Sequence, residues 1–177
     1  MPFSLKPVFI GYEISTSLLR DYDLSSNILG VGLKSHPNDP WMLNNRAYVN
    51  ARINKLDEAE KDMEQLEHCN KALSESMSIC KEATHGLIAY RRKDREKGRK
   101  LYEQAILRAS TMKENSEEIK VKAQINMLRE EIIFSNYQNT SALMELEQLV
   151  IPNEKLELVK LRNEVFDEMK KNEKNQG

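Results

Sequence analysis

The sequence has few of the residues that cross-link a chain or turn it sharply. Its 177 residues include two cysteines, six glycines and five prolines. Two cysteines outside a Cys-x-x-Cys pair are too few for a disulfide framework, which favours a reducing, cytoplasmic location. So few turn residues disfavour a sheet fold, whereas 40% hydrophobic and 31% charged residues suit a hydrated helical protein with apolar stripes.

The chain also lacks an excess of charge of either sign. Its 27 lysines and arginines nearly balance 28 aspartates and glutamates, giving a net charge of -1. The chain as a whole therefore does not attract nucleic acid or an anionic membrane, and neither is expected as a general partner. No apolar window approaches the length of a membrane span, and the apolar stretch 8–19 contains Glu13 without a following cleavage pattern.

Signatures of catalysis and of cofactor binding are missing as well. The histidines, His36, His68 and His85, have no metal-site spacing, and Cys80 lies five residues before His85, which directs the two to different sides of a helix. The sequence contains no glycine-rich phosphate loop, no Gly-x-Ser-x-Gly elbow and no His-Glu-x-x-His motif. We therefore expect a protein that is not an enzyme and uses no cofactor or metal.

What the sequence does contain is a pattern of helix pairs. Within the segment 39–66, small residues at Ala47 and Ala59 would let two successive helices touch. The same two positions recur as Gly86 and Gly98, each 39 residues further along. Self-similarity at this spacing predicts an array of stacked helix pairs.

A weaker copy of the pattern precedes this segment. These segments resemble the tetratricopeptide family, and a step of that family's period, about 34 residues, toward the N-terminus places Ser25, Leu29 and Gly32 on core positions of a second helix. Pro37 then lies where that helix would end, and residues 36–40 read as a turn between pairs.

These segments resemble the tetratricopeptide family over about residues 8–110. The resemblance implies an all-α fold in which antiparallel helix pairs stack as a right-handed α-solenoid, a tetratricopeptide-like superhelix. We expect a single domain over residues 1–171 and a disordered tail over 172–177. The expected parts are helix pairs at 7–37, 40–72 and 77–112, a degenerate pair at 116–150, and a capping helix at 154–171 whose apolar stripe is Leu158, Leu161, Val165 and Met169.

The resemblance also implies what the protein binds. In this family the first helix of each pair lines a concave groove that holds a peptide. We therefore expect a protein–protein interaction scaffold, or the regulatory repeat segment of a larger protein, that binds a peptide or partner protein there. The groove residues that the family's register nominates are Asn44, Asn45, Tyr48, Arg52, Thr84, Leu87, Tyr90 and Arg91. Amides, guanidinium groups and phenol rings suit a polypeptide ligand.

Three questions stay open at this level. Only Asn45 matches the carboxylate clamp with which some family members hold chaperone tails, so that role is disfavoured. Arg46 and Asn50 occupy positions that are apolar in the family, so either the helix is rotated slightly or a buried polar contact lies there. A homo-oligomer is a further alternative, because an incompletely capped array exposes an apolar end.

One segment carries a local excess of positive charge. Residues 91–100 include seven basic and two acidic residues, a local net charge of +5. The alternative function is therefore an RNA-binding helical repeat that uses this basic turn, although a solvated turn explains the charge as well. The residues that would contact an anionic partner are Arg92, Lys93, Arg95, Lys97, Arg99 and Lys100.

Overall fold

The computed structural model describes residues 5–69, 71–114 and 116–176, and within these ranges every regular element is helical and none is a strand. The prediction of an all-α protein is thus confirmed. The elements are α1 (Lys6–Glu13), the π-helix η1 (Ile14–Leu19), α2 (Tyr22–Ser35), α3 (Pro40–Arg52), α4 (Leu56–Glu67), α5 (Glu75–Arg91), α6 (Arg95–Thr111), α7 (Ser116–Phe134), α8 (Thr140–Gln148), the 3₁₀ turn η2 (Pro152–Glu154) and α9 (Leu156–Gln176).

The C-terminal helix is longer than the sequence predicted. A disordered tail was expected over 172–177, and in the structure α9 continues to Gln176. Residue 177 lies outside the described residues.

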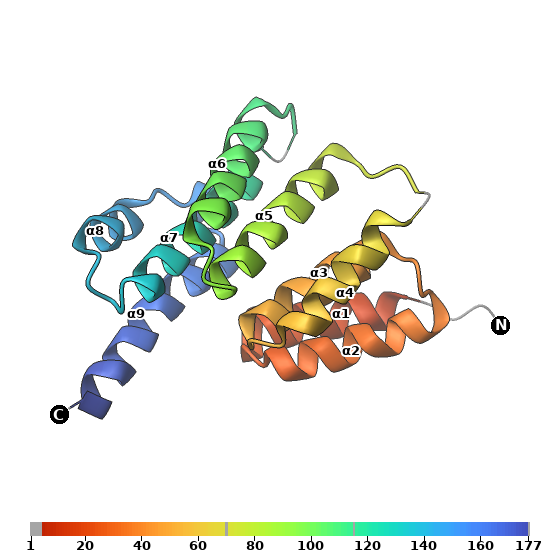
Figure 1. Cartoon of the computed structure of the whole chain (residues 1–177), viewed down its shortest axis with the longest axis horizontal. Coiled ribbons are helices and arrows are strands. Elements are labelled where there is room, and N and C mark those ends of the chain that lie inside the picture. The colour runs from red at the N-terminus through yellow and green to blue at the C-terminus, as the bar shows by residue number, and fades with distance from the viewer. Residues whose placement is uncertain (1–4, 70, 115, 177) are drawn as a thin grey trace.

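Most helices pack against the helices that precede and follow them in the sequence. Figure 1 shows α1–α4 together at one end, α6–α9 at the other, and α5 between the two groups. The first helices of successive pairs contact one another, α3 with α5 and α5 with α7. The last helix, α9, returns to contact α7 and η1. Within the described part of the chain, none of the helices combines the length and apolar character needed to cross a bilayer.

The turns inside three helix pairs share one hydrogen bond at the end of the first helix. Each contains a residue in the left-handed region, namely Asn54 (φ 63°), Lys93 (φ 70°) and Asn136 (φ 54°). The next residue then donates its N–H to the carbonyl five positions earlier, as in a Schellman helix end. These bonds join Lys55 to Asn50 (2.8 Å), Asp94 to Ala89 (2.9 Å) and Tyr137 to Ile132 (2.8 Å). The turns of α3–α4 and α5–α6 are therefore alike, whereas the turn of α7–α8 shares the hydrogen bond but has a second left-handed residue, Tyr137 (φ 64°).

Small residues bring the two helices of a pair together. A Cβ atom added at Gly98 would lie 2.5 Å from Cδ2 of Tyr90 and 3.0 Å from the carbonyl oxygen of Gly86. Ala47 and Ala59 are completely buried at the corresponding places of α3 and α4. The contact that the sequence indicated between these helices is present in both pairs.

The unusual polar residues of α3 are held by buried polar contacts. Arg46 forms a two-pronged pair with the buried Asp62 of α4, from Nε to Oδ2 at 2.8 Å and from Nη2 to Oδ1 at 2.5 Å. Asn50 accepts a hydrogen bond from the Ser26 hydroxyl of α2 at 2.7 Å. Of the two alternatives that the sequence left open, the buried polar contact is the one observed.

Candidate functional site

A cavity of about 190 Å³ lies where α1, η1, α3, α5, α7 and α9 face one another. A second cavity of about 100 Å³ adjoins it and shares part of its wall. The side chains that line both are Tyr12, Asn44, Asn45, Tyr48, Cys80 and Lys122. Because these side chains are mostly amides, phenols and an amine, the space suits a ligand with polar groups, such as a polypeptide.

The wall nearest the N-terminus is held by its own hydrogen bonds. The Tyr12 hydroxyl donates to Oδ1 of Asn45 at 2.9 Å, and Nδ2 of Asn45 donates to the Trp41 carbonyl at 2.8 Å. The Tyr12 and Trp41 rings meet edge to face, with centroids 5.1 Å apart. This wall is therefore preorganised, which reduces the entropy that a ligand must overcome.

Asn44 differs from its neighbours because its amide is not fully bonded. The residue is only 4% exposed, lines both cavities, and its Oδ1 atom has no hydrogen-bond partner within the described structure. A buried amide oxygen without a partner costs free energy, so proteins seldom keep one without a reason. A donor group of a ligand could remove this cost.

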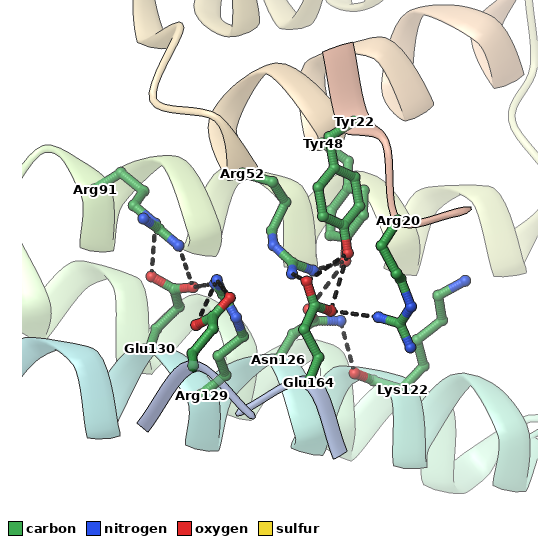
Figure 2. Close-up of polar contacts among 11 residues, drawn as sticks. Arg20, Tyr22, Tyr48, Arg52, Arg91, Lys122, Asn126, Arg129, Glu130 and Glu164 are labelled. Carbon is green, nitrogen blue, oxygen red and sulfur yellow. Dashed lines mark hydrogen bonds and ion pairs between the residues drawn. The ribbon is translucent and has the colours of Figure 1, made fainter. Parts of the chain in front are cut away.

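The opposite wall is a polar network that joins three helices (Figure 2). The Tyr48 hydroxyl donates to Oδ1 of Asn126 at 3.1 Å and accepts from Nη1 of Arg52 at 2.8 Å. Nη2 of Arg52 donates to Glu164 of α9 at 2.8 Å. The Arg52 guanidinium also lies 4.5 Å from the centroid of the Tyr22 ring, so it is held between an aromatic face and a carboxylate.

Glu164 is the centre of this network. It accepts hydrogen bonds from Arg52, from Arg20 and, at 3.0 and 3.1 Å, from the Tyr22 hydroxyl. Burial alone would raise the pKa of Glu164, but the neighbouring charges of Arg52 and Arg20 outweigh it, and the pKa is lowered from its ordinary value of 4.5. The carboxylate is therefore ionised, and it ties α9 to the N-terminal half of the chain.

A second network lies further along α5 and α7. The Tyr90 hydroxyl donates to Glu131 at 2.6 Å, and Arg91 donates to Glu130 at 3.0 Å. Arg129 pairs with Glu130 at 2.6 Å, and Figure 2 shows these three charged side chains, Arg91, Glu130 and Arg129, in a row. Burial and the hydrogen bond to Glu131 raise the pKa of Tyr90, which keeps its hydroxyl a donor.

The predicted groove residues thus fall into three groups. Asn44, Asn45, Tyr48 and Thr84 come together around the cavities. Leu87 is completely buried in the core. The remaining three, Arg52, Tyr90 and Arg91, are bonded to carboxylates of α7 and α9. The chain's own C-terminal helices therefore contact these three residues.

Other wall residues were not predicted from the sequence. Tyr12, Trp41 and Lys122 line the larger cavity together with Glu157 and Leu161 of α9. Most of these residues lie in α1, α7 or α9, where the repeat pattern is weak or ends. No signal in the sequence showed that α7 and α9 would turn back toward α1 and α3.

The basic turn is partly neutralised. Arg92 forms ion pairs with Asp57 and Glu60 of α4, Arg95 pairs with Glu131 at 2.6 Å, and Arg99 with Glu103 at 2.9 Å. The three lysines of the predicted patch are exposed, namely Lys93, Lys97 and Lys100. Much of the local positive charge is therefore cancelled by neighbouring carboxylates, and the field that would attract a nucleic acid is weaker than the sequence alone indicates.

Comparisons of the chain with protein-family models, with curated proteins and with solved structures gave no match.

Proposed function

We propose that this chain is a protein–protein interaction module of the tetratricopeptide kind, in which stacked helix pairs form a right-handed superhelix and a segment of a partner protein binds on the concave side. A hydrogen bond shared by three turns and the small-residue contacts within the pairs support the repeat arrangement. As an interaction module, the protein would act without catalysis or cofactors, in the cytoplasm.

One observation carries the binding proposal. Asn44 is buried against two adjoining cavities, and its amide oxygen has no partner within the described structure. The surrounding Asn45 and Tyr48 are held in place by hydrogen bonds to neighbouring helices. A preorganised wall beside an unsatisfied amide is what a site for a polypeptide backbone requires, since the backbone offers a donor and an acceptor at every residue.

RNA binding through the basic turn is the alternative function. Its support is reduced because Arg92, Arg95 and Arg99 pair with carboxylates of the same chain. The exposed lysines of the turn would still contact phosphates, in which case binding would weaken steeply with salt.

The test is affinity capture from the native cell extract with the full chain as bait, with and without ribonuclease, followed by mass spectrometry. The matched bait carries Asn44→Ala, which alters the cavity and no hydrogen bond made by its side chain. The proposal expects discrete proteins that survive ribonuclease and are lost or reduced with the Asn44→Ala bait. Recovery that disappears with ribonuclease and is unchanged by Asn44→Ala would instead support the basic turn.

A further inference from the structure

The last helix carries two stripes that both face the rest of the chain. Glu157, Glu164 and Glu168 lie on one side of α9 at spacings of seven and four residues, which is one face of a helix. Leu158, Leu161 and Val165 are buried beside them and pack in an apolar cluster with α7 and α8. The helix α9 is therefore amphipathic in an unusual way, because acidic and apolar stripes together make up its inward face.

Each glutamate of the acidic stripe meets a cation supplied by another helix. Lys122 of α7 pairs with Glu157 at 2.9 Å, and Arg129 of α7 pairs with Glu168 at 2.9 Å. The third glutamate, Glu164, bonds with Arg52 of α3 and with Arg20, as Figure 2 shows. The cations on the inner side of the array thus form a template that matches an acidic helix.

One of these cations depends on α9 for its carboxylate. With α9 in place the Arg52 side chain is 1% exposed and pairs with Glu164, whereas Arg129 also pairs with Glu130 of its own helix. An unpaired buried charge is strongly destabilising. A helix that takes the place of α9 and excludes water from Arg52 in the same way must therefore bring a carboxylate to the position of Glu164, which defines the chemistry of the replacement.

The position of α9 is connected to the proposed binding site. Glu157 and Leu161 form part of the wall of the larger cavity, beside Asn44 and Tyr48. A partner segment that extended along the cavity would meet α9 directly. The groove and the α9 site are thus continuous.

The link that precedes α9 holds backbone strain. Asn153 (φ 49°) and Glu154 (φ 48°) are both in the left-handed region. This conformation is tolerable for asparagine but costs on the order of 1 kcal/mol for a residue such as glutamate. Detachment of α9 would relieve this strain. The backbone conformation of the link therefore opposes the docking of α9, whereas the side-chain contacts of α9 favour it.

We propose that α9 is an exchangeable occupant of the groove, and that the partner which replaces it is an acidic amphipathic helix with carboxylates spaced like Glu157, Glu164 and Glu168 beside an apolar stripe. This inference rests on the proposed function and specifies the partner for the same groove. The charge complementarity of the four cations selects an acidic helix over a basic or neutral one.

The test uses a fluorescently labelled synthetic peptide of residues 155–176 and the full chain. Its affinity is measured by anisotropy for the wild-type chain and for the chain carrying Glu157→Gln, Glu164→Gln and Glu168→Gln. The variant's own α9 competes less well, so the peptide is expected to bind it roughly tenfold more tightly than the wild type. The control peptide with the same three substitutions is expected to bind neither. Equal affinity for the two chains, or equal affinity of the two peptides, would overturn the proposal.

A second measurement does not depend on the triple variant folding. Amide hydrogen exchange of the wild-type chain is expected to show α9 opening locally, about tenfold or more faster than α3 and α5, which open with the whole molecule. Exchange of α9 at the rate of α3 and α5 would show that the helix is not exchangeable. A stable dimer in light scattering, with no peptide binding, would assign the groove to α9 of a second copy and would also overturn the proposal.

The outcomes separate this inference from the proposed function. If a protein is captured only when Asn44 is present but is not displaced by the α9 peptide, the proposed function is supported and the exchange of α9 is contradicted. If the peptide replaces α9 but no captured protein requires Asn44, the exchange of α9 is supported and the proposed function is contradicted.

Discussion

Glu164 and Arg52 are 112 residues apart in the sequence, and their side chains meet at 2.8 Å. The arginine belongs to α3 in the N-terminal half, and the glutamate belongs to the last helix. Because the Arg52 side chain is almost completely buried, this pair is a structural requirement of the docked state rather than a surface contact. It makes the docking of α9 sensitive to pH and to substitution.

Acid is expected to weaken the docking of α9. Neighbouring cations lower the pKa of Glu164 and of Glu157 from an ordinary value of 4.5, in both cases against the opposing effect of burial. A carboxyl group whose pKa is lower in the folded state contributes stability above the unfolded value and loses it as the pH falls through the folded value. Amide exchange in α9 should therefore accelerate relative to α5 below about pH 4.5. The Glu164→Gln chain should show a shallower pH dependence, and an identical profile would contradict this account.

Two glycines should respond to alanine in opposite directions. At Gly98 the added methyl group would lie 2.5 Å from the Tyr90 ring, so Gly98→Ala should destabilise the protein by about 1–3 kcal/mol through overpacking. At Gly30 of α2 the nearest atom is 3.7 Å away on the Arg46 side chain, so Gly30→Ala should stabilise by about 0.5–1 kcal/mol through helix propensity. Urea unfolding followed by circular dichroism measures both. A stabilising Gly98→Ala would show that the helices have room to separate.

The pair of Arg46 and Asp62 should be strongly coupled. Asp62→Leu leaves a partly buried guanidinium without its carboxylate and should destabilise by about 2–4 kcal/mol. Replacing both residues, as Arg46→Met with Asp62→Leu, removes the charges and should recover most of that loss. Urea unfolding of the two single variants and the double variant closes the cycle. Additive losses would indicate that the two side chains act independently.

Two buried asparagines of α3 should differ in their effect on stability. Asn50 accepts a hydrogen bond from Ser26, and Asn50→Ala should cost about 1–2 kcal/mol because the bond and its packing are lost. Asn44 has an unpartnered oxygen, and Asn44→Ala should change the free energy of unfolding by less than about 1 kcal/mol. Thermal and urea unfolding give the free energy of unfolding of both variants, and the comparison is fair because Asn44 and Asn50 are 4% and 3% exposed. A large loss at Asn44 would mean that its amide serves folding rather than binding.

The sequence predicted the helices and their pairing better than the contacts of the last helix with the N-terminal half of the chain. The apolar and small-residue spacing of Ala47, Gly86 and Gly98 located the helices and their contacts, because these patterns depend on neighbours within one helix pair. The packing of α9 against α7 and η1 could not be predicted in this way. It depends on contacts such as Glu164 with Arg20, which join residues that no local period relates. The same limit explains why Lys122 was missed while Asn44 and Tyr48 were named.

Arg46 and Asn50 of α3 illustrate a second limit of prediction from the sequence. The sequence showed polar residues at apolar positions but did not identify their partners, since Asp62 and Ser26 lie on different helices. Polar burial is specified by pairs, and one member of a pair does not reveal the other.

The long sequence separation of the Glu164 contacts bears on how the chain is made. During synthesis, the helices that carry Arg20 and Arg52 leave the ribosome long before the residue that neutralises them. Helices α1–α4 can therefore pack while both cations are still hydrated, and the pairing of these cations with Glu164 waits until α9 has been translated. The nascent chain consequently passes through a state with an open, positively charged inner side, which an acidic helix from another molecule could reach before its own C-terminus exists.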